Sequence, residues 1–292
     1  MPTQDTSVQI VPAPVPHHAL RAAEYNATVA QRVDVAPGLM ILRVVPDTRP
    51  FPFTAGQYVV LGLKASEPRM AGTDDDPEEE AAPLTGDRLI RRAYSIASSS
   101  RGEEFLEFYL TLVTSGELTP RLFHLRADDR VYLGPKAVGV FTLARTPRDR
   151  HVLLVGTGTG LAPYMSMLRS ELACGGPRRV IVLHGARYSW DLGYRAELAG
   201  LARHCPNLTY IPVVSRPTGD PTWRGHIGHL QDVLCSGAVK NETGFGLTPE
   251  NFHVYLCGHP GMIDQAIVRL VERGFRRDRG RESGSLHTEE YW

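Results

Sequence analysis

The chain of 292 residues lacks an excess of charge of either sign. Its 32 lysines and arginines balance its 32 aspartates and glutamates, so the formal net charge is zero. A protein that binds nucleic acid by neutralising the phosphates of a duplex needs a basic surplus. We therefore expect no nucleic-acid partner.

Cysteine is also scarce. The four cysteines, Cys174, Cys205, Cys235 and Cys257, stand far apart, and no two of them have the spacing of a zinc or iron–sulfur ligand pair. We expect neither a metal site nor a disulfide framework, and we interpret Cys174, Cys205 and Cys235 as packing residues. Any redox chemistry must then come from a bound organic cofactor.

Long apolar runs are missing as well. No segment approaches the length of a membrane span, and the N-terminus has no basic stretch followed by an apolar one. With 42% hydrophobic and 22% charged residues, the composition predicts a soluble globular protein without a membrane partner, which we expect to be cytoplasmic. The length suits two domains, and nothing in the sequence requires more than a monomer.

The first part of the chain has the pattern of a β-barrel. Residues 1–22 show no period and are interpreted as a flexible tail, and residues 23–147 contain many short strands and one short helix. This pattern predicts a closed antiparallel barrel. Strands are expected at 25–29, 39–45, 57–63, from 89 onward, and at 106–112, 130–133 and 140–143. A segment at 66–87 interrupts them with six acidic residues between Asp74 and Glu80, which should form a solvated insert.

The pattern changes after Arg150. Continuous apolar strands at 151–155, 180–183, 208–214 and 254–257 alternate with helical segments at 161–172, 189–203, 226–234 and 262–270. Apolar strands that alternate with amphipathic helices predict a parallel sheet covered on both faces. We therefore expect an α/β domain over residues 148–292.

One stretch of the barrel places a cation, an aromatic ring and hydroxyl groups at strand spacing. Arg92 and Tyr94 would point to one face, where a guanidinium suits phosphate and a phenol ring suits a flat conjugated ring. A flavin nucleotide offers both groups, and Ser95 and Ile96 are assigned to the same site. The alternative is an ordinary half-buried strand with an exposed arginine.

A second anion site is expected in the loop from Gly116 through Leu118. Thr119 can cap a short helix and Pro120 occupies its first turn. The free amides at the start of that helix would then be available to a phosphate group.

The α/β half carries a glycine-rich turn where its first strand meets a helix. Gly156, Gly158 and Gly160 alternate with threonines, among them Thr159. Such a turn lets the backbone approach a diphosphate, whose charge the helix N-terminus stabilises. The spacing differs from the G-x-G-x-x-G fingerprint because Leu161 replaces the third glycine. Tight packing of strand and helix is the other explanation for the turn.

Residues at the carboxyl ends of the next strands indicate which nucleotide binds. Arg187 follows the second strand, Ser215 and Arg216 end the third, and Arg224 lies beyond them. Ligands of open parallel sheets bind at this edge, where an arginine suits a ribose 2′-phosphate, so NADP is favoured over NAD. Each arginine alone is also explained as a solvated surface charge.

The fourth strand brings Cys257 and Gly258 to the same edge. A thiol is small and weakly polar, so Cys257 could flank a nicotinamide ring without excluding it. A buried cysteine away from any ligand would simply be a packing residue.

These motifs, in this order, resemble the bacterial ferredoxin (flavodoxin)–NADP reductase family. The Arg-x-Tyr-Ser strand, the Gly-Thr-Gly-Thr-Gly-Leu-Ala-Pro turn and the late Cys-Gly carry the resemblance, which extends from about Tyr25 to Trp292. It implies FAD and NADP(H) as cofactors and hydride transfer between them. It also implies exchange of single electrons with a ferredoxin or a flavodoxin as partner.

The resemblance also implies roles for single residues. Arg92 would hold the FAD pyrophosphate, Tyr94 would lie against the flavin and Ser95 near its reactive nitrogen. The implied FAD loop comprises Gly116, Leu118 and Thr119, and the implied NADP contacts are Gly158, Thr159, Gly160, Arg187, Arg216 and Cys257. At the C-terminus, Glu289 would supply a carboxylate, Tyr291 would stack on the flavin and Trp292 would cover the adenine side. Ser95, Cys257, Glu289 and Tyr291 are the expected catalytic residues.

The chain departs from the family pattern at three places. The acidic insert is longer than expected, and His259 stands where the bacterial group commonly has asparagine. Arg224 is displaced by two positions, so that His226 occupies the usual place of a third phosphate-binding arginine.

Two other functions remain open. One is the reductase component of an oxygenase, working through a separate ferredoxin because the cysteine spacing excludes a fused iron–sulfur domain. The other is a non-catalytic nucleotide-binding redox regulator. A basic run near the C-terminus comprises Arg273, Arg276, Arg277, Arg279 and Arg281. It would steer an acidic electron acceptor toward the protein. The alternatives are that the run is a solvated face or that it pairs with the acidic insert.

Overall fold

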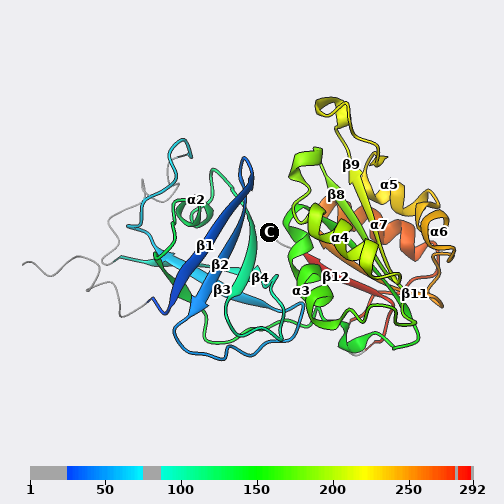
Figure 1. Cartoon of the computed structure of the whole chain (residues 1–292), viewed down its shortest axis with the longest axis horizontal. Coiled ribbons are helices and arrows are strands. Elements are labelled where there is room, and N and C mark those ends of the chain that lie inside the picture. The colour runs from blue at the N-terminus through cyan, green and yellow to red at the C-terminus, as the bar shows by residue number, and fades with distance from the viewer. Residues whose placement is uncertain (1–24, 75–86, 280–281, 291–292) are drawn as a thin grey trace, which may run out of the picture.

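Two β-sheets of six strands each form the frame of the protein (Figure 1). The computed structural model describes residues 25–74, 87–279 and 282–290. The predicted tail at 1–22 and most of the predicted acidic insert lie outside these residues.

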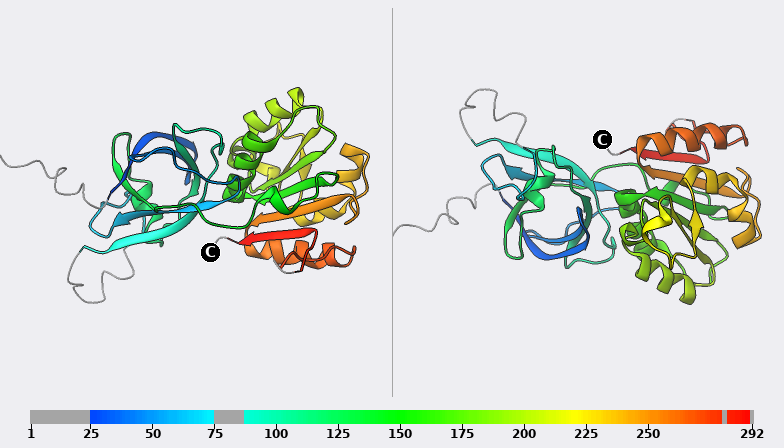
Figure 2. Two further views of the ribbon diagram at one scale, coloured as in Figure 1. Left: turned by 90° about the horizontal axis from the view of Figure 1, so that it is seen from below. Right: turned by 90° about the horizontal axis from the view of Figure 1, so that it is seen from above.

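The first sheet is antiparallel, with the strand order β4-β3-β6-β1-β2-β5. Its elements are β1 (Ala27–Ala36), β2 (Leu39–Pro46), β3 (Tyr58–Lys64), β4 (Leu89–Ser95), β5 (Leu106–Thr111), β6 (Arg130–Leu133) and one short helix, α2 (Thr119–Leu122). A bridge between Ile96 and Phe108 brings the two outer strands together, and the sheet curls around a buried core (Figure 2). Alternate residues such as Met40 and Leu42 fill that core. The predicted antiparallel barrel is confirmed.

The second sheet is parallel, with the strand order β10-β9-β8-β7-β11-β12. Its strands are β7 (His151–Thr157), β8 (Val180–Ala186), β9 (Leu208–Val214), β10 (His226–Ile227), β11 (Phe252–Gly258) and β12 (Leu286–Glu290). The helices are α3 (Ala162–Glu171), α4 (Arg195–His204), α5 (Leu230–Cys235), α6 (Ala238–Thr243) and α7 (Pro260–Val271). Short 3-10 turns occur at η1 (Leu143–Arg145), η2 (Gly158–Leu161), η3 (Ser189–Asp191) and η4 (Pro217–Gly219).

Both faces of the parallel sheet are covered, which explains the continuous apolar strands. Val152 and Leu154 of β7 pack with α3 and α4, whereas Leu153 and Val155 pack with α5, α6 and α7. A strand with a helix layer on each side has no polar face to expose. The predicted α/β arrangement is confirmed.

Some predicted elements are wrong in detail. No strand forms at 140–143, where Val140 is 87% exposed and η1 begins at Leu143. The helix expected at 226–234 starts instead as β10, because Gly228 adopts a φ of 125° and redirects the chain before α5. The terminal strand β12 was missed, since Leu286 is the one apolar residue among its five.

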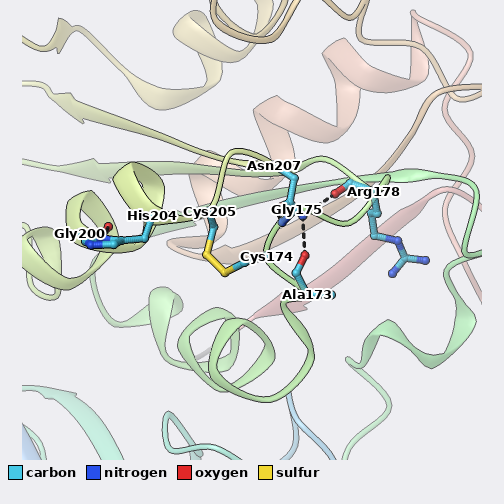
Figure 3. Close-up of a disulfide and its surroundings, with 8 residues drawn as sticks. All are labelled: Ala173, Cys174, Gly175, Arg178, Gly200, His204, Cys205 and Asn207. Carbon is cyan, nitrogen blue, oxygen red and sulfur yellow. Dashed lines mark hydrogen bonds between the residues drawn. A yellow bond between two sulfur atoms is a disulfide. The ribbon is translucent and has the colours of Figure 1, made fainter.

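The structure also corrects the interpretation of two cysteines. Cys174, in the loop after α3, forms a disulfide with Cys205, which directly follows α4, and their Cα atoms are 4.6 Å apart (Figure 3). The Asn207 side chain orders the loop: it accepts from the Gly175 amide at 2.8 Å and donates to the Ala173 carbonyl at 2.9 Å. The two cysteines therefore tie together neighbouring helices rather than merely packing.

Among the described residues, no helix has the length and apolar character needed to cross a membrane. Within the same residues, no group of three or more His, Cys, Asp or Glu side chains could hold a metal ion.

A buried histidine pair lies beside the segment that links the two sheets. His253 and His287 approach at 3.0 Å between ring nitrogens, and His287 also lies 3.3 Å from Asp278, which pairs with Arg145 of η1 at 2.8 Å. Burial, helped by the neighbouring His253, lowers the pKa of His287 to about 4. Burial also lowers the pKa of His253. Both rings are therefore neutral near pH 7.

The free energy of unfolding should fall as the pH drops from about 6.5 to about 4. In this window the unfolded chain binds a proton at His287 and the folded protein does not, so acid favours unfolding. The loss should approach about 3 kcal/mol. Urea unfolding across this range should show a smaller decrease for His287→Gln than for the parent protein. The exposed His204, changed to Gln, is the matched control, and equal slopes for all three proteins would contradict the prediction.

The disulfide gives a second prediction. It closes a loop with a sequence separation of 31 residues, so it should restrict the unfolded chain by about 3 to 4 kcal/mol in the chain-entropy description. Cys174→Ser should lower the midpoint of urea unfolding under oxidising conditions and should leave it unchanged in the presence of a thiol reductant. Cys235→Ser, which removes a cysteine outside the disulfide, should have no such redox-dependent effect. If the reductant leaves the midpoint of urea unfolding of the parent protein unchanged, the disulfide does not form.

Candidate active site

The site lies where the parallel strands end beside the barrel. The last strand, β12, ends between the two halves of the molecule (Figure 1). It pairs in parallel with β11, which pairs in parallel with β7, so these strands end on the same side. This is the edge at which open parallel sheets bind ligands.

Three of the four expected catalytic residues meet at this edge. The Ser95 hydroxyl, at the end of β4, donates a hydrogen bond to Glu289 Oε1 at 3.1 Å. Glu289 stands in register with Cys257 of β11, whose side chain is fully buried. A barrel strand and two strands of the parallel sheet thus bring a hydroxyl, a carboxylate and a thiol into one region. The fourth residue, Tyr291, lies outside the described residues, as does Trp292.

On the barrel side, the expected phosphate-binding arginine already has a partner. The Arg92 guanidinium forms an ion pair with Glu117, which also pairs with Arg88. These contacts, with the hydrogen bond from Arg88 first, hold the pKa of the Glu117 carboxyl below its usual range. Arg92 is 54% exposed, and an exposed ion pair contributes at most about 1 kcal/mol. Arg92 therefore keeps an accessible guanidinium although it is paired.

The other residues of the expected flavin strand differ in their surroundings. Tyr94 is half-buried, and burial raises the pKa of its hydroxyl. The Ile96 side chain is fully buried in the barrel core, and its amide donates to the Gln57 carbonyl at 3.0 Å. Tyr94 thus retains a surface for a ring system, whereas the Ile96 side chain serves packing.

The loop before α2 is formed differently from the prediction. Thr119 does not cap the helix, because its hydroxyl accepts from the Val113 amide at 3.0 Å and donates to the Val113 carbonyl at 3.1 Å. The residue at the N-cap is Leu118, which is buried. Arg69 donates to the Gly116 carbonyl at 3.1 Å. The expected capping role of Thr119 is therefore wrong, and its side chain instead fixes the shape of the loop.

The glycine turn after β7 combines an accessible backbone with a close approach to β11. Gly158 has a φ of 53°, and a Cβ added there would meet nothing within 4 Å, so the backbone is open to an approaching group. A Cβ at Gly160 would lie 2.5 Å from the Cys257 carbonyl, so only glycine lets η2 approach β11 so closely. Thr159 lies between these glycines and is half-buried. The turn needs its glycines both for close packing and for access.

The arginines expected at the 2′-phosphate lie at the ends of neighbouring strands. The Arg216 amide donates to the Arg187 carbonyl at 2.8 Å, and the Ser215 amide to the Ala186 carbonyl at 3.0 Å, so the two chain segments run side by side. Both arginine side chains are exposed. Arg224 instead donates to its own loop, at 2.8 Å to the Pro221 carbonyl.

Three residues contribute in ways that the sequence reasoning missed. Tyr188 and Trp190 lie within three residues after Arg187, and their rings stack 4.7 Å apart at 7°. His259, where asparagine was expected, caps α7, because its ring nitrogen accepts from the Gly261 amide at 3.1 Å. Asparagine is a favoured capping residue, so the histidine preserves that function. Gly258, just before it, has a φ of 124° and lies against Thr157.

The described part of the basic run leads from the end of α7, where Arg273 donates to the Cys235 carbonyl at 2.9 Å, to the edge strand β12. Arg277 bridges to Leu286 at the start of β12, and its side chain reaches the Thr288 hydroxyl at 3.3 Å. Arg281 is outside the described residues. At the described end of the acidic insert, the Thr114 hydroxyl donates to Asp74 Oδ2 at 3.1 Å. Residues 75–86 of the insert lie outside the described residues, so its pairing with the basic run stays a prediction.

Comparisons with known proteins show the fold and the family of the chain. A family model described as the oxidoreductase NAD-binding domain matches residues 154–267. A solved ferredoxin NADP+ reductase from Neisseria gonorrhoeae, with bound FAD and NADP, covers 92% of this chain and has a TM-score of 0.74 at 22% identity. It shows the shared fold.

Sequence relatives are closer in identity. The phenol 2-monooxygenase reductase component DmpP of a Pseudomonas species is 32% identical over 259 residues, which span 87% of this chain and 64% of that protein. The flavodoxin/ferredoxin–NADP reductase of Escherichia coli is 32% identical over 243 residues, which span 82% of this chain and 88% of that protein. The match thus covers most of the E. coli reductase. A flavodoxin/ferredoxin–NADP reductase of Buchnera aphidicola is 28% identical, also over 243 residues. The chain therefore belongs to the flavodoxin/ferredoxin–NADP reductase family.

Proposed function

We propose that the protein transfers hydride between NADP(H) and FAD, and single electrons between FAD and a ferredoxin or a flavodoxin. The proposal includes a division into an FAD-binding half at 23–147 and an NADP-binding half at 148–292. The observation that carries it is the hydrogen bond between Ser95 of the barrel and Glu289 of the parallel sheet. It supports a single reaction centre to which both halves contribute.

The barrel side binds and orients the flavin. When bound, FAD supplies a ring that accepts hydride and releases electrons singly. Tyr94 offers its ring face, and Arg92, released from Glu117, neutralises the pyrophosphate beside the Gly116 loop. Ser95 presents its hydroxyl at the reactive edge and holds its proton toward Glu289. The residues of the barrel thus fix the flavin from the ring to the phosphates.

The parallel sheet binds and orients NADP(H). Gly158 to Gly160 lie along the diphosphate, Arg187 and Arg216 bind the 2′-phosphate, and Cys257 with Gly258 borders the nicotinamide. The stacked rings of Tyr188 and Trp190 offer a flat surface for the adenine. These contacts all lie within the α/β half. NADP(H) is therefore held by one half of the protein, and the flavin by the other.

The function is tested by reduction of the purified protein. It should be yellow, and NADPH should bleach it under anaerobic conditions, after which added ferredoxin or flavodoxin should be reduced. Ser95→Ala should slow bleaching by about 10- to 100-fold, because a group at the reacting edge is lost. Ser66→Ala is the control, since its hydroxyl also donates to a carboxylate, that of Asp87 at 2.6 Å, but on the outside of the barrel. A colourless protein would point instead to the non-catalytic regulator.

A reductase component of an oxygenase is the second candidate. The similarity to DmpP favours it, although this chain spans less of that protein than of the E. coli reductase. The two candidates differ in the acceptor. If the reduced protein passes electrons rapidly to an oxygenase ferredoxin, and only slowly to flavodoxin and to other ferredoxins, the second candidate holds.

Nucleotide preference gives a further prediction. Arg187→Ala and Arg216→Ala should each raise the KM for NADPH by about 10- to 100-fold, since a hydrogen bond to a charged group contributes about 1.5 to 3 kcal/mol. The KM for NADH should stay unchanged, because NADH lacks the 2′-phosphate. Arg203→Ala, which removes an exposed arginine from α4, is the matched control. An equal rise in the KM for NADH would show that these arginines do not recognise the 2′-phosphate.

A further inference from the structure

One arginine of the α/β half holds the barrel with its guanidinium. Arg169, in the last turn of α3, donates from Nη1 to the Ala97 carbonyl at 2.8 Å and to Glu107 Oε1 at 2.6 Å. Its other nitrogens donate to the two carboxylate oxygens of Glu197 on α4, at 2.8 and 2.7 Å. All three guanidinium nitrogens are used. They connect α3 and α4 of the α/β half to the Ala97 carbonyl and the Glu107 carboxylate of the barrel.

The barrel partner, Glu107 of β5, is a buried and fully hydrogen-bonded carboxylate. It is 1% exposed, and it also accepts from Arg43 Nε at 2.8 Å and from the Tyr194 hydroxyl at 2.7 Å. Burial alone would raise the pKa of the Glu107 carboxyl, but the Arg169 charge and these donors outweigh burial and hold it below its usual range. A buried charge needs such partners, so each donor has a fixed place.

The same network fixes the start of α4. Tyr194 precedes this helix with a φ of 58°, a left-handed conformation that is unfavourable for a residue with a side chain. Its ring meets Tyr109 edge-on at 5.0 Å, and the Arg169 guanidinium lies 5.1 Å from its centre. The barrel residues Glu107 and Tyr109 therefore hold Tyr194, and through it α4, in one orientation.

The network connects the two sides of the proposed reaction centre, although none of its residues is placed against a cofactor. Ala97 lies two residues after Ser95, on the chain that we assign to the flavin. At its other end, α3 begins directly after the turn at Gly158–Leu161 that we assign to NADP. The helix has ten residues, a rod of about 15 Å. A change in the angle of α3 at Arg169 therefore shifts the turn at Gly158–Leu161, on the proposed nicotinamide side, relative to the chain at Ser95, on the proposed flavin side.

We propose that Arg169 is a positioning residue, which sets the alignment of nicotinamide and flavin by clamping α3 to Ala97 and Glu107. The inference rests on the proposed function. Lysine could not replace this arginine, because a point charge cannot serve a bidentate carboxylate, a second carboxylate and a carbonyl at the same time. A displacement of about 1 Å at the reacting atoms can reduce a rate by about 100-fold.

The test separates alignment from binding. Arg169→Lys should lower the rate constant of flavin bleaching by NADPH by about 10- to 100-fold. The dissociation constant of NADP+ should change less than about threefold, because its proposed contacts all lie within the α/β half. Glu107→Gln, which changes the barrel partner of Arg169, should likewise slow bleaching and leave the dissociation constant of NADP+ nearly unchanged. Arg130→Lys is the matched control, since Arg130 joins Asp47 at 2.7 Å and Thr28 at 2.6 Å entirely within the barrel.

Hydrogen exchange provides a readout that does not depend on turnover. The Ser100 amide of the barrel donates to the Ser170 hydroxyl of α3 at 2.8 Å, across the clamped contact. It should exchange faster in Arg169→Lys, while the Leu61 amide in the barrel core should stay protected.

The outcomes are distinct. An unchanged bleaching rate, unchanged exchange at Ser100, or a parallel loss of rate and NADP+ affinity would each overturn the clamp. If NADPH fails to bleach the parent protein, the proposed function fails, and faster exchange at Ser100 in the variants still supports the clamp.

Discussion

The buried carboxylate of Glu107 is the constraint on which the arrangement of the two halves depends. It lies on a barrel strand, yet two of its donors belong to the α/β half: Arg169 of α3 and Tyr194, the residue before α4. A buried charge is stable only with its full set of partners, and each partner has a defined direction. The apolar contacts around it supply burial, but they are not directional. The relative orientation of the halves therefore rests on this polar cluster.

Two further links strengthen the unit that the cluster holds. Arg169 pairs with Glu197, and the disulfide between Cys174 and Cys205 joins the ends of the same two helices, α3 and α4. A charged link and a covalent link therefore both join α3 to α4. Barrel contacts at Glu107 then act on both helices and on the glycine turn from which α3 begins.

The sequence predicts the architecture well because both sheets follow simple patterns. Core residues at every second position identify a strand that faces a barrel core, as at Leu106, Phe108 and Leu110 of β5, whereas continuous apolar strands identify a sheet covered on both sides, as in β7. Cys257 and the glycine turn at Gly158 to Gly160 meet because the parallel strands β11 and β7 end at one edge. This convergence follows from the topology, so the pattern of strands and helices along the chain is enough to infer it.

The remaining features depend on contacts between residues that are distant in the sequence. Ser95 and Glu289 are 194 positions apart, and β12 has too few apolar residues to be recognised before β11 is in place to pair with it. Thr119 illustrates a different limit, since its hydroxyl had two available partners and the loop geometry selected Val113. Propensity identifies the candidates for such contacts, and only the tertiary arrangement selects among them.

His259 and Arg169 show which properties of a residue the fold requires. At His259 the requirement is an acceptor at the start of α7, and a ring nitrogen meets it as an asparagine side chain would. At Arg169 the requirement is several donors in a fixed plane, which no other side chain supplies. A capping position can therefore change its residue while the helix is kept. A residue that joins two helices to a barrel strand and to its backbone has no equivalent substitute, so the geometry of the reaction centre depends on a side chain outside it.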